Sequence, residues 1–235
     1  MIKILCVGDG FGKGHVHPMW PQILTKVVHN TQIDNLCEVG AGNEFIANAV
    51  IDACEHAEYD YVFVQWALSQ RLDLINQNQN GITKAIVKDP TYNNKYSNVL
   101  LKKRSWWLSS ASKIDLIKDY HKNYITNEQH CLRSIFYIKM IDMYLKEKKI
   151  TNLFFSSYNL DFLDLSESKL IDWSNWHNEK IGMHEYGKKY LPKYTSKEIQ
   201  PHTMVHIDYV QNVLCPSVGL EPDSLKLKEM RSIYA

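Results

Sequence analysis

The residues whose types and spacing could support chemistry begin within the first fourteen positions of the chain. Residues 8–14 read GDGFGKG, in which four glycines alternate with other residues and Asp9 is the only carboxylate. Glycine permits positive φ angles and a close approach of the backbone to a ligand, so this segment can present N–H groups. A carboxylate in the same segment can orient a base or bind a polar group. We therefore expect an active or binding site here.

Histidines form a second set of candidates. His15 and His17 are separated by one residue, and His202 and His206 are four residues apart in an expected helix. Such spacings can bring two imidazoles to one metal ion. For His202 and His206 we favour a structural or general-base role over ligand contact, and ligand contact over metal binding. For His15 and His17 we favour solvent-facing loop positions, so the sequence predicts no metal and no cofactor.

Two large side chains follow the strongest strand signal of the chain, the segment 59–67 with the sequence YDYVFVQWA. Trp66 lies at its end and Arg71 shortly after it. Side chains in such positions can wall a ligand pocket, and an arginine can clamp an anion. A core tryptophan and a surface arginine are the alternative, and the sequence favours neither interpretation.

The segments that must position these residues alternate between strand and helix, which predicts an α/β domain. Short apolar runs predict buried strands at residues 2–7, 36–39, 59–67 and 150–156. Between them apolar residues recur at helical spacing, and one helix begins with the capping-box residues Thr126 and Gln129. We expect the apolar stripe of that helix to consist of Leu132, Ile135, Phe136, Met140, Met143 and Tyr144.

Length and composition fit a single domain spanning residues 1–235, with insertions at about 72–111 and 158–197. The 27 Lys and Arg residues balance 26 Asp and Glu residues, so the formal charge of +1 gives no indication of a nucleic-acid partner. The five cysteines are odd in number and form no C-x-x-C pair, which favours buried thiols in a reducing compartment. No run approaches the ~18 apolar residues of a membrane span. We expect a cytoplasmic protein without a membrane partner.

A dinucleotide-binding fingerprint is one interpretation of the glycine-rich segment, with Glu38 as the acid that binds a ribose. The fingerprint requires a glycine three residues after Gly10, where this chain has Lys13. The first clear helical spacing also begins only after residue 18. Nucleotide binding is therefore the least favoured of the functions considered.

Several blocks in the same order carry a resemblance to a known family. Residues 8–14 follow the first strand, GAGN at 40–43 follows the second, VFVQWALSQR occupies 62–71, and EIQPH at 198–202 leads into the last helix. Together they resemble the SGNH/GDSL hydrolases, particularly the divergent versions carried by large tailed bacteriophages. The resemblance spans nearly the whole chain. It implies a three-layer α/β/α sandwich with a parallel flavodoxin-like sheet, a site at the carboxyl ends of the strands, and ester or acetyl-ester hydrolysis on carbohydrate or lipid.

The chain departs from the family pattern at the residues that perform catalysis. Gly10 stands where the resemblance places the nucleophilic serine, and Gly40 matches the second oxyanion donor. The family asparagine has no counterpart, because Ala67 or Leu68 stands there, although Asn43 could reach the same space from the neighbouring loop. Acyl transfer through a serine is therefore not supported by these residues.

The last block can be aligned with the family in two ways. If Pro201 matches the family proline, Glu198 takes the place of the acid and Gln200 that of the histidine. A slip of two residues makes His202 the base instead. Three explanations fit the missing serine. His202 could activate water together with Asp9 or Glu198, the site could have become a binding pocket, or Gly10 could be an engineered replacement of a native serine.

We expect a pocket at the strand ends that binds a small molecule or a carbohydrate. The residues assigned to its catalytic part are Asp9, Gly10, Gly40, Asn43 and His202, and those assigned to substrate binding are Trp66, Arg71, Glu198, Gln200 and His206. The function expected from the resemblance is that of an SGNH/GDSL-hydrolase-like protein with lost or altered serine chemistry. The alternative is a non-catalytic carbohydrate-binding or virion-associated interaction protein, acting in an infected host cell if a phage encodes it. The sequence does not determine the oligomeric state.

Overall fold

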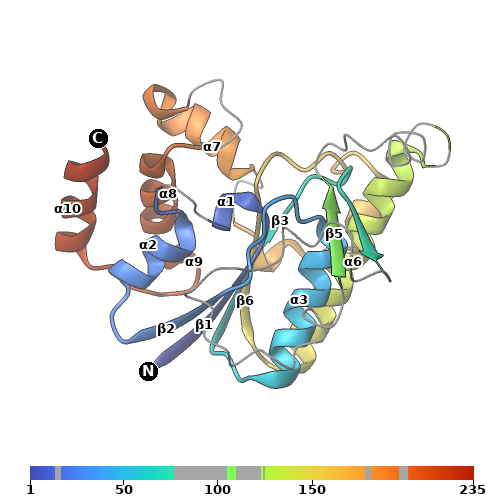
Figure 1. Ribbon diagram of the computed structural model, residues 1–235, viewed down its shortest axis with the longest axis horizontal. Helices are drawn as coiled ribbons and strands as arrows, with labels where there is room; N and C mark the ends of the chain where they lie inside the picture. Colours follow the sequence, from blue (N-terminus) through green and yellow to red (C-terminus); the bar gives the residue numbers. More distant parts are fainter. Residues whose placement is uncertain (14–16, 77–104, 110–122, 124, 178–180, 196–200) are drawn as a thin grey trace.

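Four parallel strands form the central sheet of the protein, in the spatial order β2-β1-β3-β6 (Figure 1). These strands are β1 (Ile2–Val7), β2 (Thr31–Asn35), β3 (Tyr61–Trp66) and β6 (Thr151–Ser156). The computed structural model describes the chain except for residues 14–16, 77–104, 110–122, 124, 178–180 and 196–200. The strand order is that of a flavodoxin-like sheet, so the predicted α/β class is confirmed.

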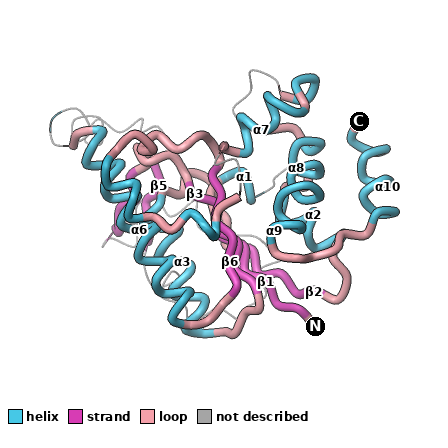
Figure 2. Tube along the Cα trace, turned by 180° about the vertical axis from the view of Figure 1, so that it is seen from behind, coloured by secondary structure: helices cyan, strands magenta, loops and turns pink. Residues whose placement is uncertain are grey.

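Helices cover both faces of this sheet, which makes a three-layer α/β/α sandwich. The helices α3 (Asn43–His56) and α6 (Asn127–Glu147) lie on one face, and α2 (Trp20–Val27) and α8 (Thr203–Tyr209) lie on the other (Figures 1 and 2). Successive strand residues point to opposite faces. Leu5, Val64 and Phe154 accordingly pack in the α3 and α6 core, whereas Cys6, Phe63 and Phe155 pack in the α2 and α8 core.

The second strand lies earlier in the chain than the segment 36–39 that the sequence analysis favoured. Strand β2 pairs with β1 in the register Ile2↔Thr31 to Cys6↔Asn35. The following segment still runs beside the end of β1, because the Leu36 N–H donates to Cys6 and the Glu38 N–H donates to Gly8. The apolar residues at 36 and 37 therefore fill space at the end of the sheet without forming a ladder of their own.

The remaining elements surround this framework. An antiparallel pair of strands, β4 and β5, forms a separate two-stranded sheet within the predicted first insertion. The described residues of the predicted second insertion include three 3₁₀-helical turns and the helix α7. In chain order these elements are α1 (Gly10–Lys13), β4 (Leu72–Asn76), β5 (Ser105–Ser109), η3 (Ser166–Leu170), η4 (Trp173–Asn175), α7 (Met183–Tyr190), η5 (Pro192–Tyr194), the π-helical turn η6 (Val210–Leu214), α9 (Cys215–Ser217) and α10 (Ser224–Tyr234). Among the described residues, no helix combines the length and the apolarity needed to span a bilayer.

Residues 10–13 of the glycine-rich segment form a short helix, α1, rather than the open loop expected from the sequence. Its glycines allow close packing: a Cβ atom at Gly8 would lie 2.7 Å from the Cβ atom of Gln65, and one at Gly12 would lie 2.7 Å from that of Cys37. Gly10 and Gly12 are both buried. These glycines therefore bring the end of β1 against its neighbours.

Helix α6 begins as the sequence predicts, because Thr126 and Gln129 form the expected capping box. Its expected core-facing stripe is wrong for three residues, which are exposed on the outer side of the helix: Phe136, Met140 and Met143. The apolar residues that the helix buries are Cys131, Ile135, Ile138, Ile141 and Leu145. The sequence has apolar residues on both sides of this helix, so spacing alone could not identify the inner face.

Candidate functional site

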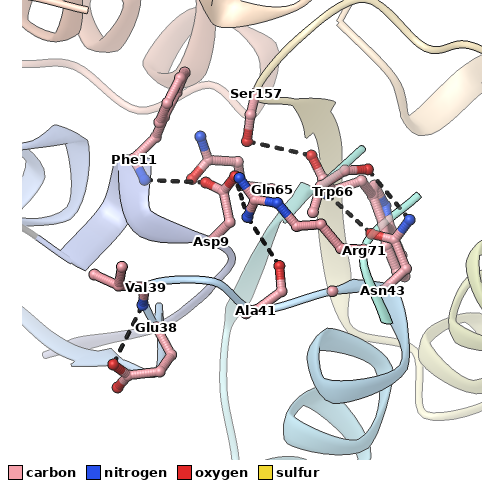
Figure 3. A network of polar contacts seen from close by, with 12 residues as sticks. Asp9, Phe11, Glu38, Val39, Ala41, Asn43, Gln65, Trp66, Arg71 and Ser157 are labelled. Atoms are coloured by element: carbon pink, nitrogen blue, oxygen red, sulfur yellow. Dashed lines mark hydrogen bonds and ion pairs between the residues drawn. The ribbon is translucent and has the colours of Figure 1, made fainter. Parts of the chain in front are cut away.

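The carboxyl ends of β1, β3 and β6 lie side by side, and the chain leaves β1 toward β2 but leaves β3 in the opposite direction, toward β6. In doubly wound sheets this topological switch point is where ligands bind. Asp9 follows β1, Trp66 ends β3, and Ser157 follows β6 (Figure 3). The predicted location of the site at the strand ends thus coincides with the switch point of the observed sheet.

Asp9 is completely buried and makes a network of polar contacts (Figure 3). Its Oδ1 accepts a hydrogen bond from the Phe11 N–H at 3.0 Å, and its Oδ2 lies 2.9 Å from Nη1 of Arg71. Burial raises the pKa of Asp9, although the Arg71 charge and hydrogen bonds from the Phe11 N–H and the Ser157 hydroxyl lower it. The carboxylate is therefore held by partners from three different segments.

Arg71 joins the three loops at the switch point. Besides the ion pair with Asp9, its Nη1 donates to the carbonyl oxygen of Ala41 at 3.0 Å. Only 14% of its side chain is exposed. Neither interpretation from the sequence describes it well, because Arg71 is neither a surface residue nor a cation left free for an anionic ligand.

The loop after β2 is held in place by a carboxylate that the sequence analysis did not identify. Asp73, in β4, accepts hydrogen bonds at 2.8 Å from the N–H groups of Gly42 and Phe45, at the start of α3. Gly40 precedes this turn with φ of 82°, a backbone conformation that favours glycine. The need for glycine at position 40 is thus explained by the turn itself.

Asn43 uses its side chain to fix the segment after β3. Its Oδ1 accepts a hydrogen bond from the Ala67 N–H at 2.9 Å, and its Nδ2 donates to the Ala67 carbonyl at 3.2 Å and to Ser134 Oγ at 2.8 Å. Asn43 therefore contacts Ala67, one of the two positions that the resemblance aligns with the family asparagine. It binds the backbone there, and its hydrogen-bonding atoms are engaged within the protein.

Trp66 and Gln65 end β3 and point to opposite faces of the sheet. Trp66 is fully buried in the α3 and α6 core, with its ring 5.7 Å from that of Phe154, which fits a core tryptophan. Gln65 lies on the other face, where its Oε1 accepts a hydrogen bond from Nε1 of Trp20 at 2.9 Å. A polar residue inside the otherwise apolar strand was the signal in the sequence for this buried contact.

The two C-terminal histidines have different environments. His202 is exposed and caps α8, since its Nδ1 accepts the Met204 N–H at 3.2 Å, and its ring stacks on Tyr194. His206 is completely buried with its ring centroid 6.5 Å from that of Phe11, and burial lowers its pKa to about 3. Of the two, His206 lies against the helix that follows Asp9, whereas His202 serves as a helix cap.

Some of the candidate residues cannot be placed. Glu198, Gln200 and His15 lie outside the described residues, so the alignment of the first two with the family pattern and the expected loop position of His15 stay predictions. His17 is exposed, as expected for a loop position. In the part of the chain that the structure describes, no group of three or more His, Cys, Asp or Glu side chains is arranged to hold a metal ion.

Ser157 and Tyr158 belong to the site but were not singled out from the sequence. Tyr158 is partly buried and its ring lies 5.2 Å from that of Phe11. Burial raises the pKa of Tyr158, the charge of Asp9 raises it further, and the charge of Arg71 lowers it. Their position directly after the predicted fourth strand was the available signal, since residues at the carboxyl end of a parallel strand face the site.

Glu38 does not present a free carboxylate to a ribose. Its Oε2 lies 2.9 Å from Nζ of Lys13, and both side chains are nearly buried. Lys13 is the residue that stands where the dinucleotide fingerprint requires glycine. The ion pair thus joins the residue that departs from the fingerprint to the acid that the fingerprint would place on a ribose, which argues against dinucleotide binding.

The buried carboxylate of Asp73 makes stability depend on pH. Burial raises its pKa to about 7, although hydrogen bonds from Phe45 and Gly42 lower it. The pKa of an aspartate in the unfolded chain is about 3.9. Between about pH 4 and pH 7 the folded state therefore binds more protons at Asp73 than the unfolded state does. The free energy of unfolding consequently falls as pH rises through this range. We expect Asp73→Asn to remove this contribution, up to about 1.4 kcal/mol per pH unit, in urea unfolding series. If the free energy of unfolding changed equally with pH in the wild-type protein and in Asp73→Asn, this assignment would be contradicted.

No family model and no curated protein matches this chain. The chemistry of the site must therefore be judged from its own residues. Asp9 and Arg71 neutralise one another, Asn43 binds backbone, and position 10 carries no side chain. Such an arrangement can hold the loops at the switch point in place, and position 10 offers no side-chain nucleophile for acyl transfer.

Proposed function

We propose that this protein is an SGNH/GDSL-hydrolase-like protein in which serine acyl transfer has been lost and the site at the switch point binds a ligand. The main support is the state of the residues after β1. Gly10 supplies no nucleophile, and the adjacent Asp9 carboxylate is buried and paired with Arg71. A site of this family without its serine keeps at most the roughly 10³–10⁴-fold acceleration that binding and the oxyanion hole provide.

The environment of His202 supports the same proposal. A general base needs a ring nitrogen within hydrogen-bond reach of the proton that it removes. Nδ1 of His202 already accepts the Met204 N–H, and its ring stacks on Tyr194 at a centroid distance of 5.4 Å. His202 is therefore used as a helix cap in this structure, and we do not assign it the role of general base.

A small molecule or a carbohydrate is the ligand class that we propose. Tyr158 places an aromatic ring near the charged pair of Asp9 and Arg71, and the buried ring of Phe11 lies 5.2 Å from that of Tyr158. Sugars combine apolar ring faces with hydroxyl groups, and sites for such ligands combine aromatic side chains with a few placed polar groups. A virion-associated interaction protein on the same fold is the alternative, and nucleotide binding is disfavoured by the Lys13–Glu38 pair.

Hydrolysis of p-nitrophenyl acetate and its short-chain homologues tests the loss of catalysis. The wild-type protein should show no turnover above the uncatalysed rate, and His202→Ala should be indistinguishable from it. Gly10→Ser, assayed at equal concentration, reports whether the scaffold accepts a nucleophile at this position. Turnover by the wild-type protein that disappears in His202→Ala would establish a hydrolase that needs no serine at position 10, with His202 as its base, and would refute the proposal.

Calorimetric titration with a panel of neutral sugars tests the ligand class. We expect saturable binding that Tyr158→Ala weakens by at least about tenfold, because it removes a ring of the site. Tyr190→Ala is the matched control, since Tyr190 is an exposed tyrosine on α7. Binding that the control variant loses to the same extent would place the ligand elsewhere.

A further inference from the structure

One stripe of α8, which we call the α8 stripe, carries polar side chains that the fold buries without hydrogen-bond partners. Thr203, His206 and Tyr209 follow one another at intervals of three residues and are 2%, 0% and 0% exposed. Among the described residues, no hydrogen bond of normal geometry reaches the two hydroxyl groups or the ring nitrogens of His206. The Pro201 carbonyl lies close enough to raise the pKa of His206, but burial outweighs it.

Polar atoms in this situation are costly in a folded protein. Buried polar atoms nearly always have a partner, because an atom without one loses its hydrogen bonds to water and gains none in return. On α7, His184 adds a further atom of this kind, since its Nδ1 is also buried and no described residue binds it. Groups that lower stability without a structural return are typical of functional sites. The α8 stripe is therefore a candidate for contact with a ligand.

The α8 stripe adjoins the switch-point site. The ring of His206 lies 6.5 Å from that of Phe11, which follows Asp9 at the end of β1. The ring of Tyr209 lies 5.6 Å from that of Phe155 in β6. A ligand at the strand ends is thus within one side chain of the stripe.

The chemistry of the α8 stripe suits uncharged hydroxyl groups. Burial lowers the pKa of His206 to about 3, so its ring is neutral at pH 7. Burial also lowers the pKa of His184, and the charge of Lys188 lowers it further whereas that of Glu185 raises it. A neutral imidazole has one donor and one acceptor nitrogen, and the hydroxyl groups of the stripe both donate and accept. A sugar hydroxyl also does both, whereas an anionic group would leave the acceptors of the stripe unused.

We propose that the α8 stripe is a subsite for the hydroxyl groups of an uncharged sugar bound at the switch point. This subsite rests on the proposed function, because the same sugar occupies both places. Helix α7 covers the stripe through Tyr186, whose ring lies 5.0 Å from that of Tyr209 and whose hydroxyl donates to Asp208 at 2.8 Å. Since water does not reach the stripe in this structure, α7 moves away from α8 when the sugar enters.

Isosteric removal of the two hydroxyl groups distinguishes a ligand subsite from a structural role. Thr203→Val and Tyr209→Phe keep the shape of each side chain and remove only the group that lacks a partner. Because no hydrogen bond is lost, both variants should unfold thermally at or above the wild-type temperature. In calorimetric titration with the panel of neutral sugars, each variant should bind at least about tenfold more weakly than the wild-type protein.

Tyr59→Phe is the matched control, because Tyr59 precedes β3 at the amino end of the sheet. Tyr59 is also buried, but its hydroxyl donates to Asp34 at 2.9 Å. This variant should unfold at a lower temperature and bind sugar as the wild-type protein does. If Thr203→Val and Tyr209→Phe bound sugar as tightly as wild type, or unfolded at a lower temperature, the subsite alone would be overturned. A wild-type protein that binds no sugar of the panel would refute the proposed function and the subsite with it.

Discussion

Replacing Arg71 by methionine should destabilise the protein by about 3–5 kcal/mol at neutral pH. This change keeps the length of the side chain but leaves the Asp9 carboxylate buried without its cation, a situation that typically carries a cost of this size. It also removes the hydrogen bond to the Ala41 carbonyl. Urea unfolding at constant pH measures the change in the free energy of unfolding. Because Arg71 connects the loops after β1, β2 and β3, we expect the loss to disorder the whole site.

The double variant Asp9→Asn with Arg71→Met is the matched control for this prediction. It removes both charges, so it should be less destabilised than Arg71→Met alone. The cost of Arg71→Met should also shrink at acidic pH, since burial raises the pKa of Asp9 and protonation removes the uncompensated charge. An Arg71→Met protein as stable as wild type would show that this pair does not hold the site together.

Replacing Gly182 by alanine should destabilise the protein by at least about 3 kcal/mol. Gly182 precedes α7 with an ordinary backbone conformation, φ −67° and ψ 156°, so the effect would be purely steric. A Cβ atom there would lie 2.5 Å from the carbonyl oxygen of Tyr158 and would overlap the rest of its backbone. Main-chain atoms cannot move aside as a side chain can, so this overlap should exceed the usual 1–3 kcal/mol of overpacking.

The Gly187→Ala variant in the same helix is the control for Gly182. Its Cβ atom would lie 3.0 Å from side-chain atoms of Thr195 and Val205, which can shift, and alanine favours the helix by up to about 1 kcal/mol. Thermal unfolding should therefore show a large drop for Gly182→Ala and a small change for Gly187→Ala. Similar unfolding temperatures for the two variants would contradict the close approach of α7 to Tyr158.

The alternation of strand and helix was predictable because buried parallel strands leave a strong apolar signal. The segments 2–7, 59–67 and 150–156 became strands of one parallel sheet, since each run is long enough to be buried on both faces. The position of β2 was not predictable in the same way. Its residues are half-buried at the edge of the sheet, so the more apolar segment after it gave the stronger signal.

The sequence could predict that several candidate residues meet at the strand ends, but it could not predict the contacts that they make there. The glycines and Asp9 pointed to the end of β1, and parallel topology brings that end to the switch point. That Arg71 would bind Asp9, and that Asp73 would hold the start of α3, depends on contacts between distant segments. Such pairings leave no periodic signal in a single sequence, and the same is true of the buried position of His206.

The roles of His202 and His206 illustrate this limit. Their spacing of four residues places both on α8 or at its start, but spacing does not tell which ring faces the core. The structure buries His206 and leaves His202 as an exposed cap with its Nδ1 bound to the Met204 N–H. The assignment of a general base to position 202 consequently rests on the resemblance alone.

The most direct test of the central proposal is covalent trapping with a fluorophosphonate, followed by mass spectrometry of the intact protein. A serine hydrolase forms a stable adduct on its nucleophile, whereas a site with Gly10 in that position has no such group. We predict that the wild-type protein remains at its unmodified mass under conditions that fully label a known serine esterase. A stoichiometric adduct, on Ser157 or on any other serine, would contradict the proposed loss of serine chemistry.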